Sequence, residues 1–408
     1  MPILAHKIRL YPNNKQETLF RKSCGVARFA YNWALVEWTR QYKAGEKPSY
    51  FSLNKLLNSI KETEYPWMKE ISKNVPQRAV ENLSRAYKNT FTNIKKGKKG
   101  KKAGFPKFKK KYHHDSFRAD TGTSKQSPNT VKITKDKVKL PRIGWVRLAE
   151  PLRFSGRIIS AVVSRSADKW FVSLNVETDQ KLSIKADLGS VGVDLGITTL
   201  ATLSTGEEIV GPKAYTKQLK QLRRLSKSLS RKQKGSNNRA KAKTKLARLH
   251  FKIANIRKDS LHKLTNKLVT NYSVIGIEDL NTSGMVKNRK LSRSISDMGW
   301  FEFKRQLLYK AEMTGSKVVI IDRFFPSTKT CSDCGMIHKM PLSKRMMVCD
   351  CGLVMKRDLN AAINLKHKAV SSPVSACGEE SSGFGGLTET KLASEKQELS
   401  FDFIEKLN

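Results

Sequence analysis

The fold is decided by the stretch Ser190-Val-Gly-Val-Asp-Leu-Gly-Ile-Thr-Thr-Leu-Ala-Thr-Leu203. Its apolar residues predict a buried strand that ends at Asp194, then a tight turn at Gly196 and a second strand. A single carboxylate after an apolar strand is weak evidence for an active site. The evidence is stronger here because two similar sites follow along the chain.

The two further sites also place a carboxylate at the boundary of a regular element. In Val274-Ile-Gly-Ile-Glu-Asp-Leu280 a β-rich run ends at Glu278, and in Arg357-Asp-Leu-Asn-Ala-Ala-Ile-Asn364 a helical run opens at Asp358. Three carboxylates from separate segments can hold two divalent cations, which clamp the attacking and leaving oxygens of a phosphodiester. Hard cations such as Mg²⁺ prefer oxygen ligands. The sequence therefore predicts an active site at Asp194, Glu278 and Asp358.

The composition indicates a polyanionic partner. The chain has 408 residues, with 79 Lys and Arg against 35 Asp and Glu, and a formal net charge of +44. Such an excess favours nucleic acid, and 38% hydrophobic residues suffice for real cores in more than one domain. The chain has no apolar run long enough for a membrane span, and its first residues lack the apolar h-region expected of a signal peptide. We expect a soluble, intracellular protein without a membrane partner.

The first hundred residues predict a strand followed by helices. Residues 3–10 have the pattern of a strand with interleaved basic residues, and Asn13 or Asn14 can cap a helix to about Trp38. A second helix is expected over Leu53–Glu62, and a third begins near Pro76, a residue favoured in the first turn. Residues 13–94 are therefore expected to form a small helical unit.

A lysine-rich segment follows over residues 95–111. Its composition cannot build a packed core, so we expect a flexible loop that orders on phosphates. A solvated lysine run is the alternative, but the interleaved Phe105, Pro106 and Phe108 favour contact with nucleic acid.

Between Thr130 and Glu177 the pattern changes to period two. This alternation predicts a small antiparallel barrel or sandwich, which the N-terminal strand can join, with the helical unit inserted after that strand. The expected strands are Thr130–Thr134, Lys137–Leu140, Trp145–Leu148, Arg157–Arg165 and Trp170–Val176.

Residues 217–258 contain many Lys and Arg and not one acidic residue. Leucines and isoleucines mark one face on either side of Gly235, which predicts an antiparallel helical hairpin over 217–270 with one apolar seam. A solvated coiled-coil-like pair is the alternative. Because like charges at i,i+4 destabilise a helix, such a basic face favours contact with phosphates.

The remaining pattern is α/β. Ser296 or Asp297 can cap a helix through about Met313, and Lys317–Ile321 forms a short apolar strand. Strands therefore alternate with helices from Ser190 to the helix that begins with Asp358.

Four of the six cysteines stand in two close pairs before Asp358. This arrangement suits tetrahedral Zn²⁺, and four thiolates leave no open position, so the metal is expected to be structural. The second pair is C-x-C rather than C-x₂-C, and His338 is a weaker candidate ligand. Cys24 and Cys377 stand alone, which disfavours a disulfide framework. The expected zinc ligands are Cys331, Cys334, Cys349 and Cys351.

These motifs together resemble the TnpB (OrfB) family of bacterial and archaeal insertion sequences, the small relatives of type V CRISPR effector nucleases. The resemblance rests on Val-Gly-Val-Asp194-Leu-Gly, Ile-Glu278-Asp-Leu, the cysteine pairs and Arg-Asp358-Leu-Asn-Ala-Ala-Ile-Asn. The opening Lys-Ile-Arg-Leu-Tyr-Pro and the segment Gly-Phe-Pro-Lys-Phe-Lys are also similar, so the resemblance covers about residues 1–366.

The resemblance implies an RNA-guided DNA endonuclease of a transposable element. The guide RNA would come from the element's own end, and base pairing would select the target double-stranded DNA beside a short flanking motif. A single RuvC site would cut both strands. We expect a monomer in the bacterial or archaeal cytoplasm, associated with the nucleoid.

The resemblance also implies a multidomain α/β plus β-barrel fold. Its parts would be an RNase H-like RuvC nuclease domain with an inserted zinc finger, and a wedge-type β-barrel with a helical recognition insertion. The expected boundaries are 1–12 and 112–182 for the barrel, 13–111 for the insertion with its basic loop, 183–326 and 353–370 for the nuclease domain, 327–352 for the zinc finger and 371–408 for a disordered tail.

Residue roles follow from the matching positions. Asp194, Glu278 and Asp358 would hold two Mg²⁺ or Mn²⁺ ions. Asp279 should point to the opposite side of its strand from Glu278 and is not expected to take part. Asp322 also follows an apolar strand and is a lesser candidate for an active-site carboxylate. The expected nucleic-acid contacts are Lys73 and Gln77 for the flanking motif, and Lys98, Lys99, Lys101 and Lys102 in the basic loop.

Three other functions share part of these features. An RNA-guided repressor with an inactive nuclease would bind DNA without cutting it, but all three acidic positions are filled. A transposase acting directly in strand transfer could use the same carboxylates and would join DNA ends. A guide-free, structure-selective nuclease would act without RNA, and the extensive basic regions exceed its needs.

Overall fold

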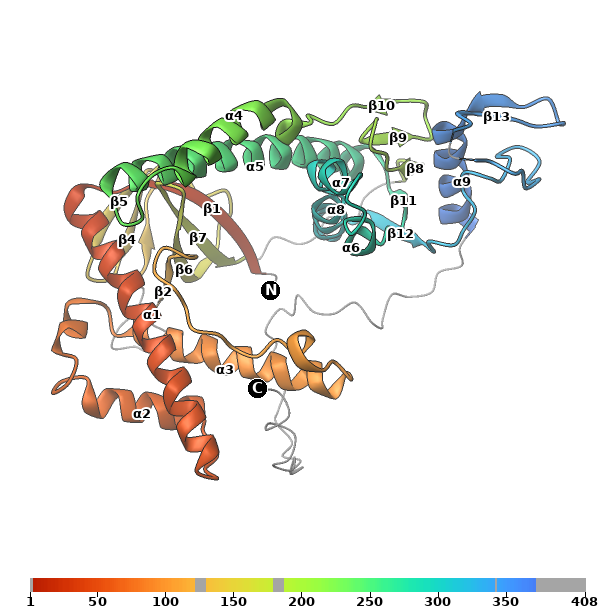
Figure 1. The fold of residues 1–408 in the computed structure, drawn as a ribbon. Helices are drawn as coiled ribbons and strands as arrows, with labels where there is room; N and C mark the ends of the chain where they lie inside the picture. Colours follow the sequence, from red (N-terminus) through yellow and green to blue (C-terminus); the bar gives the residue numbers. More distant parts are fainter. Residues whose placement is uncertain (1–2, 122–129, 179–186, 342, 372–408) are drawn as a thin grey trace. The chain divides into compact units, whose positions relative to one another are not determined.

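The computed structural model describes residues 3–121, 130–178, 187–341 and 343–371. They belong to two compact units, one within residues 1–180 and the other within 181–381 (Figure 1). The expected disordered tail lies outside the described residues beyond Ser371, and so does Cys377. Within the described ranges, every helix is too short or too polar to cross a membrane.

The helical part of the first unit begins with a strong N-terminal cap. The Asn13 side chain accepts a hydrogen bond from the Gln16 amide at 2.9 Å, and the Gln16 side chain accepts from the Asn13 amide at 3.1 Å. This capping box starts a helix that runs five residues beyond the predicted end. The helices are α1 (Asn14–Lys43), α2 (Tyr50–Ile60) and α3 (Asn74–Lys95), with 3₁₀ turns at Pro66–Glu70 and Gly100–Lys102.

The strands of this unit form one antiparallel sheet in the order β2-β6-β7-β1-β5-β4-β3. The N-terminal strand lies inside it, paired with β7 from Ile3 opposite Glu177 to Leu10 opposite Trp170, and with β5 on its other side. In the described residues β2 and β3 are open edges, so the ladder does not close into a barrel. The strands are β1 (Ile3–Tyr11), β2 (Ser116–Asp120), β3 (Lys132–Ile133), β4 (Lys137–Leu140), β5 (Gly144–Leu148), β6 (Arg157–Ser166) and β7 (Lys169–Glu177).

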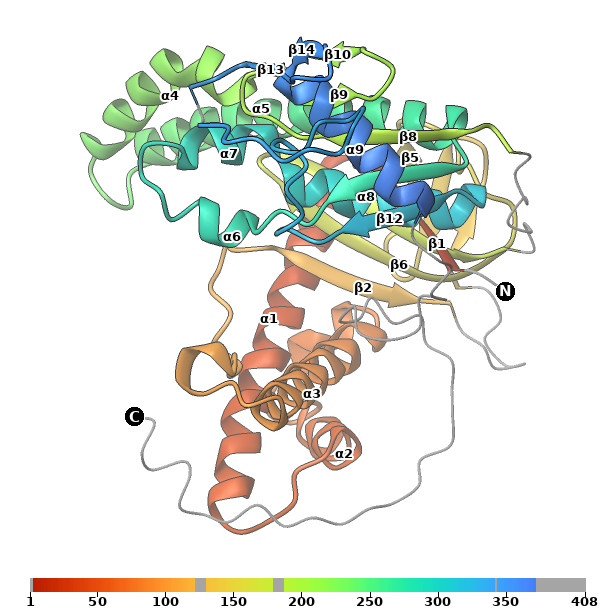
Figure 2. The same ribbon diagram turned by 90° about the vertical axis from the view of Figure 1, so that its right-hand side faces the viewer.

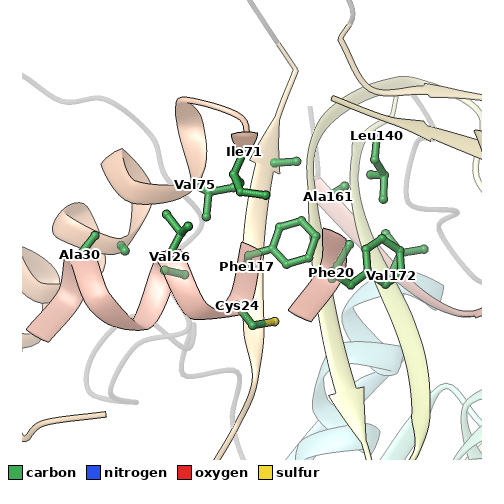
Figure 3. Close-up of a cluster of buried hydrophobic side chains, with 14 of the residues drawn as sticks. Phe20, Cys24, Val26, Ala30, Ile71, Val75, Phe117, Leu140, Ala161 and Val172 are labelled. Carbon is green, nitrogen blue, oxygen red and sulfur yellow. The ribbon is translucent and has the colours of Figure 1, made fainter. Parts of the chain in front are cut away.

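The sheet and the helices share a single core. Phe20 of α1 lies 5.9 Å from the Phe117 ring and 5.0 Å from the Trp170 ring, measured between centroids (Figure 3). Val75 of α3 and Leu140 of β4 belong to the same buried cluster. Because burial of large apolar side chains is the main source of stability, the helical insertion and the sheet fold as one body.

The second unit contains the sheet β10-β9-β8-β11-β12, in which β8, β11 and β12 are parallel and β9 and β10 antiparallel. Alternate residues of a strand face opposite sides. Val191 and Ile275 pack into a core with residues of α5 and α8. α9 runs alongside β8 and β11 (Figure 2), and Gly192 and Gly276 lie against it. The strands are β8 (Ser190–Asp194), β9 (Ala201–Leu203), β10 (Glu208–Ile209), β11 (Val274–Glu278) and β12 (Lys317–Ile321).

Two long helices connect β10 to β11. Leu222 of the first and Leu249 and Ile253 of the second are buried together, with Leu225 and Leu246 packed beside them. The remaining surface carries the basic side chains. These helices are α4 (Ala214–Ser230) and α5 (Asn237–Asn271).

The helix predicted to start at Ser296 or Asp297 is two helices joined at Gly299, a residue in the left-handed region with φ +73°. The expected cap is wrong, because Ser296 and Asp297 lie within the last turn of the first helix, which ends at Met298. The buried Asp297 carboxylate instead accepts hydrogen bonds from the amides of Tyr215 and Thr216 at 3.0 and 3.2 Å, and so caps α4. The helices that follow β11 are α6 (Thr282–Met285), α7 (Ser292–Met298) and α8 (Trp300–Thr314).

The last part of the unit is a small hairpin followed by a helix. β13 (Met346–Val348) pairs with β14 (Val354–Lys356), and α9 (Arg357–Ser371) follows without a break. α9 lies on β8, β11 and β12, and its Leu365 is fully buried against Ile321. The chain therefore returns to the sheet after the cysteine-rich segment.

Candidate active site and metal centre

The first two carboxylates stand side by side at one edge of the sheet. β8 and β11 are parallel and Val193 lies opposite Ile277, so Asp194 and Glu278 are the next residues on neighbouring strands. Each is the last residue of a strand whose central residues are buried on both faces. Parallel strands that end together place their carboxyl-terminal side chains at one crevice, which is where open α/β sheets bind ligands.

The third carboxylate comes from α9. Asp358 lies in the first turn of this helix, next to Arg357, whose Nε is 3.4 Å from the Asp358 Oδ1. Burial, together with the nearby charges of Asp358 and Glu278, raises the pKa of Asp194 to about 7, against the lowering effect of Arg357. The structure therefore brings together the three carboxylates that the sequence singled out.

Glu278 is also disfavoured as an anion. Burial raises its pKa, and the adjacent Asp279 contributes in the same direction. A cluster of half-buried carboxylates holds its charge poorly in water-poor surroundings, and a divalent cation would relieve the repulsion. These oxygen donors fit Mg²⁺ or Mn²⁺, although within the described ranges only the cysteines form a group with all ligand atoms within 4.8 Å.

Asp279 takes part in an ion-pair cluster. Its carboxylate accepts from Lys304 Nζ at 2.9 Å and pairs with the Arg323 guanidinium, and both partners lower its pKa. Asp322, the lesser candidate, accepts a hydrogen bond from the Phe324 amide at 2.8 Å. Both side chains are therefore engaged in contacts that stabilise the ends of the strands.

The four predicted cysteines form the metal-ligand cluster, with all sulfur atoms within 4.8 Å of one another. Sγ of Cys334 lies 3.4 Å from Sγ of Cys349, and Sγ of Cys331 lies 3.7 Å from Sγ of Cys351. A tetrahedral zinc with bonds of about 2.3 Å separates its sulfur ligands by about 3.8 Å. The cysteine pairs therefore fit one structural Zn²⁺.

Tight turns present these thiolates. The backbone carbonyl of Cys331 accepts a hydrogen bond from the Gly335 amide at 3.0 Å, and the backbone carbonyl of Cys349 accepts from the Gly352 amide at 3.0 Å. Both glycines have positive φ, +78° and +94°. His338 Nε2 lies 3.1 Å from Cys349 Sγ, so this imidazole contacts a thiolate that the four-cysteine set already includes.

Two residues that the sequence analysis did not single out join the cysteine module to α9. Asn360 donates to the Thr330 carbonyl at 2.7 Å and accepts from the Ser332 amide at 2.9 Å. Asn364, one turn later, also donates to Thr330 at 2.7 Å and to Ser327 at 2.8 Å. Both asparagines are buried within an apolar helix face, and that placement is the signal that could have identified them.

The expected nucleic-acid residues lie on the surface of the first unit. Lys73 is exposed and immediately precedes α3, whereas Gln77 is half-buried in the first turn of that helix. The four loop lysines, Lys98, Lys99, Lys101 and Lys102, are exposed, and Lys98 Nζ donates to Asn93 at 3.0 Å.

Comparison with known proteins places this architecture in a family. A family described as "Probable transposase" (OrfB_IS605) matches residues 173–289, and "Cas12f1-like, TNB domain" matches 300–365. "Helix-turn-helix domain" matches residues 1–47, although the structure there consists of β1 and the single helix α1.

Full-length relatives are also similar. The chain is 38% identical to the "Putative RNA-guided DNA endonuclease" of Streptomyces pristinaespiralis over 92% of this chain and 91% of the relative. It is 35% identical to "Putative RNA-guided DNA endonuclease InsQ" of Escherichia coli K12, over 92% and 94%. The chain belongs to the TnpB (OrfB) family of insertion-sequence proteins.

A solved structure has the same fold at much lower identity. The protein of the "Cas12f1-sgRNA-target DNA complex" matches with a TM-score of 0.53 and 13% identity, over 90% of this chain and 98% of the other. The match shows that the two proteins share a fold.

Proposed function

We propose that this protein is an RNA-guided DNA endonuclease of a transposable element, which hydrolyses double-stranded DNA beside a short flanking motif. One observation carries the proposal: Asp194 and Glu278 end neighbouring parallel strands, and Asp358 lies in the first turn of the helix that packs on those strands. The relatives of this chain are named as RNA-guided DNA endonucleases. In this scheme base pairing with a guide RNA supplies the sequence specificity.

The carboxylates are proposed as the catalytic groups of a RuvC-type, RNase H-like site. They would hold two Mg²⁺ or Mn²⁺ ions, which when bound activate water and stabilise the leaving oxygen of a phosphodiester. Asp194 and Glu278 bind from neighbouring strands, and Asp358 binds from α9. Asp279 holds Lys304 and Arg323 in place beside this edge.

The charge distribution supports guide RNA and target DNA as partners. The α4–α5 hairpin carries a continuous basic sequence from Lys217 to Lys258. Lys73 and Gln77 are proposed to contact the flanking motif, and the loop lysines to contact phosphates. We propose a monomer with a wedge-type domain built on the open antiparallel sheet of the first unit and a RuvC-type nuclease domain in the second.

The zinc is proposed to have a structural role. Its cysteine module is tied to α9 by Asn360 and Asn364, and α9 carries Asp358. Loss of the metal would therefore reach the active site through the position of this helix.

The test is purification from cells that also carry the DNA downstream of the gene, followed by sequencing of the bound RNA. We expect one discrete species, structured in its 5′ part and ending in sequence from beyond the element. The complex should then cut a matching plasmid in Mg²⁺, and Asp194→Ala should retain binding and lose cleavage by a factor of more than about 10³.

Two outcomes would contradict the proposal. Heterogeneous RNA that salt removes would mean that the charge of the protein binds polyanions without selection. Full Mg²⁺-dependent cleavage by Asp194→Ala would remove the catalytic assignment. Binding of the target without cleavage by the wild type would favour the repressor, and covalently joined DNA ends would favour direct strand transfer.

A further inference from the structure

The first unit contains a hollow that none of the functions above uses. It has a volume of about 490 Å³, within the range of small-ligand sites, and most of its lining is apolar. α1 forms one wall, and residues on either side of α3 complete it. The lining residues are Gly25, Arg28, Phe29, Asn32, Trp33, Val36, Tyr65 and Phe108.

The wall that carries Phe108 is held in place, in contrast to the flexible loop predicted from the sequence. Asn32 of α1 donates to the Lys109 carbonyl at 3.0 Å and accepts from the Lys109 amide at 2.8 Å. Thr90 donates to the Gly104 carbonyl at 2.9 Å, and Asn93 donates to the Ala103 carbonyl at 3.2 Å. The segment therefore presents its aromatic residues in a fixed arrangement.

Several aromatic rings surround the hollow, and some of them are exposed to solvent. Phe29 packs edge-on against Tyr65 at 4.8 Å and against Trp67 at 5.1 Å, between ring centroids. Phe108 nevertheless stays 58% exposed and Trp67 42% exposed. Exposed aromatic rings beside an apolar hollow provide faces on which a planar group can stack.

The surroundings favour a planar group that is attached to phosphates. The segment from residue 95 to 111 contributes ten lysines and no acidic residue. Lys109 Nζ lies 4.1 Å from the centre of the Tyr31 ring, and Arg28 lies 3.7 Å from the Asp115 carboxylate. An apolar hollow under a cationic rim complements a nucleobase and its backbone better than it complements an apolar peptide.

We propose that this hollow binds an unpaired nucleobase of the guide RNA, stacked against Phe108. The proposal rests on the proposed RNA-guided function and adds a protein site for a single-stranded part of that RNA. RNA is favoured over DNA because proteins recognise RNA mainly through unpaired bases that stack on aromatic side chains.

The experiment uses the full-length protein and a short oligouridine that contains one 2-aminopurine, with its deoxy counterpart as the second arm. Salt is raised until binding through phosphates alone is suppressed. Phe108→Ala removes the stacking face, and Val36→Glu places a negative charge in the hollow. Phe51→Ala is the matched control, because Phe51 is 79% exposed on α2 and does not line the hollow.

We expect Phe108→Ala and Val36→Glu to weaken binding of the ribo-oligomer about tenfold and to reduce fluorescence quenching, with Phe51→Ala unchanged. A 4-thiouridine probe should cross-link to peptides containing Phe108 or Tyr65. Equal effects of Phe108→Ala and Phe51→Ala, or an effect on the deoxy-oligomer alone, would overturn the proposal.

The cleavage assay separates this inference from the function on which it rests. Guided cleavage by the wild type, together with unaltered RNA binding by Phe108→Ala, would remove the base site and leave the nuclease. If no discrete guide RNA is found, the proposed function is wrong, regardless of whether the protein binds the oligomer.

Discussion

The main chain of Ala362 in α9 lies so close to Gly192 in β8 that a Cβ on Gly192 would overlap the Ala362 carbonyl oxygen. Gly276 makes the same approach in β11, where a Cβ would lie 2.6 Å from the Leu365 carbonyl oxygen. Neither glycine has a positive φ, so the close packing of the helix, rather than the backbone conformation, requires them. This contact fixes how near Asp358 lies to Asp194.

Gly192→Ala should therefore displace α9. Overpacking of this kind costs about 1–3 kcal/mol in the free energy of unfolding. A displacement near 1 Å at the reacting groups can lower the rate of cleavage about 100-fold. Urea unfolding and the guided cleavage assay measure the two effects. Gly206→Asn is the control, because a Cβ there meets open space and Asn tolerates its positive φ; equal damage by both variants would refute the packing argument.

Removal of zinc should also displace α9. Cys331→Ala is expected to lose the metal, lower the melting temperature and abolish cleavage, because Asn360 and Asn364 attach the cysteine module to α9. Metal content and thermal unfolding are the measurements. Cys24→Ala is the control, because Cys24 does not belong to the four-cysteine cluster. It is buried in the first unit, and burial raises the pKa of its thiol to about 12. Full cleavage by a zinc-free protein would show that the module does not position Asp358.

Features set by local pattern were predicted from the sequence. β4 was expected at Lys137–Leu140 and is found there, and the strand before Asp194 ends where the apolar run ends. The carboxylates and cysteines could be identified because each follows a short motif with its own chemistry. The proximity of Asp194 and Glu278 then follows from parallel strands that end at one edge, whereas Asp358 comes from α9.

Features set by long-range pairing were missed. β2 is short and partly polar, and its Asp120 is buried only because Arg78 and Arg118 pair with it. Either Ser296 or Asp297 is predicted to cap the helix that follows it, whereas Asp297 caps α4, whose Thr216 lies 81 residues earlier in the chain. Such contacts produce no periodic pattern in the sequence, because the partners meet only in the folded state.

The Asp297 cap gives a direct test of that misassignment. Asp297→Ala should remove the hydrogen bonds to Tyr215 and Thr216 and lower the free energy of unfolding by about 1–2 kcal/mol. Denaturant unfolding is the measurement. Asp259→Ala should change stability by less than about 0.5 kcal/mol, because its ion pair with Lys263 is exposed. Similar losses for the two variants would contradict the capping role.

The pH dependence of stability should reveal the carboxylate cluster. The pKa of Asp194 rises from 3.8 to about 7 on folding, so its contribution to stability is fully present below pH 3.8 and is lost as pH rises through 7. In chelator, Asp194→Asn should become increasingly more stable than the wild type between these limits, by at most about 1.4 kcal/mol per pH unit.

Mg²⁺ should reverse that difference, because binding to the native state alone stabilises the wild type. Thermal unfolding from pH 4 to 8, with and without Mg²⁺, provides the measurement. Parallel profiles for the wild type and Asp194→Asn in chelator would mean that neither burial nor the neighbouring carboxylates raise the pKa of Asp194.

The basic hairpin allows binding and stability to be separated. Lys241, Lys245 and Lys252 are exposed on α5, and neighbours four residues apart on a helix repel when both are cationic. Replacing all three by Gln, which has a similar helix propensity, should leave the helix intact and make the free protein slightly more stable. The same change should weaken nucleic-acid binding for every sequence and reduce the slope of log K against log salt by about two to three. Unfolding curves and salt-dependent binding measure both. A solvated hairpin without a nucleic-acid partner predicts the gain in stability with an unchanged salt slope, and that result would remove α5 from the interface.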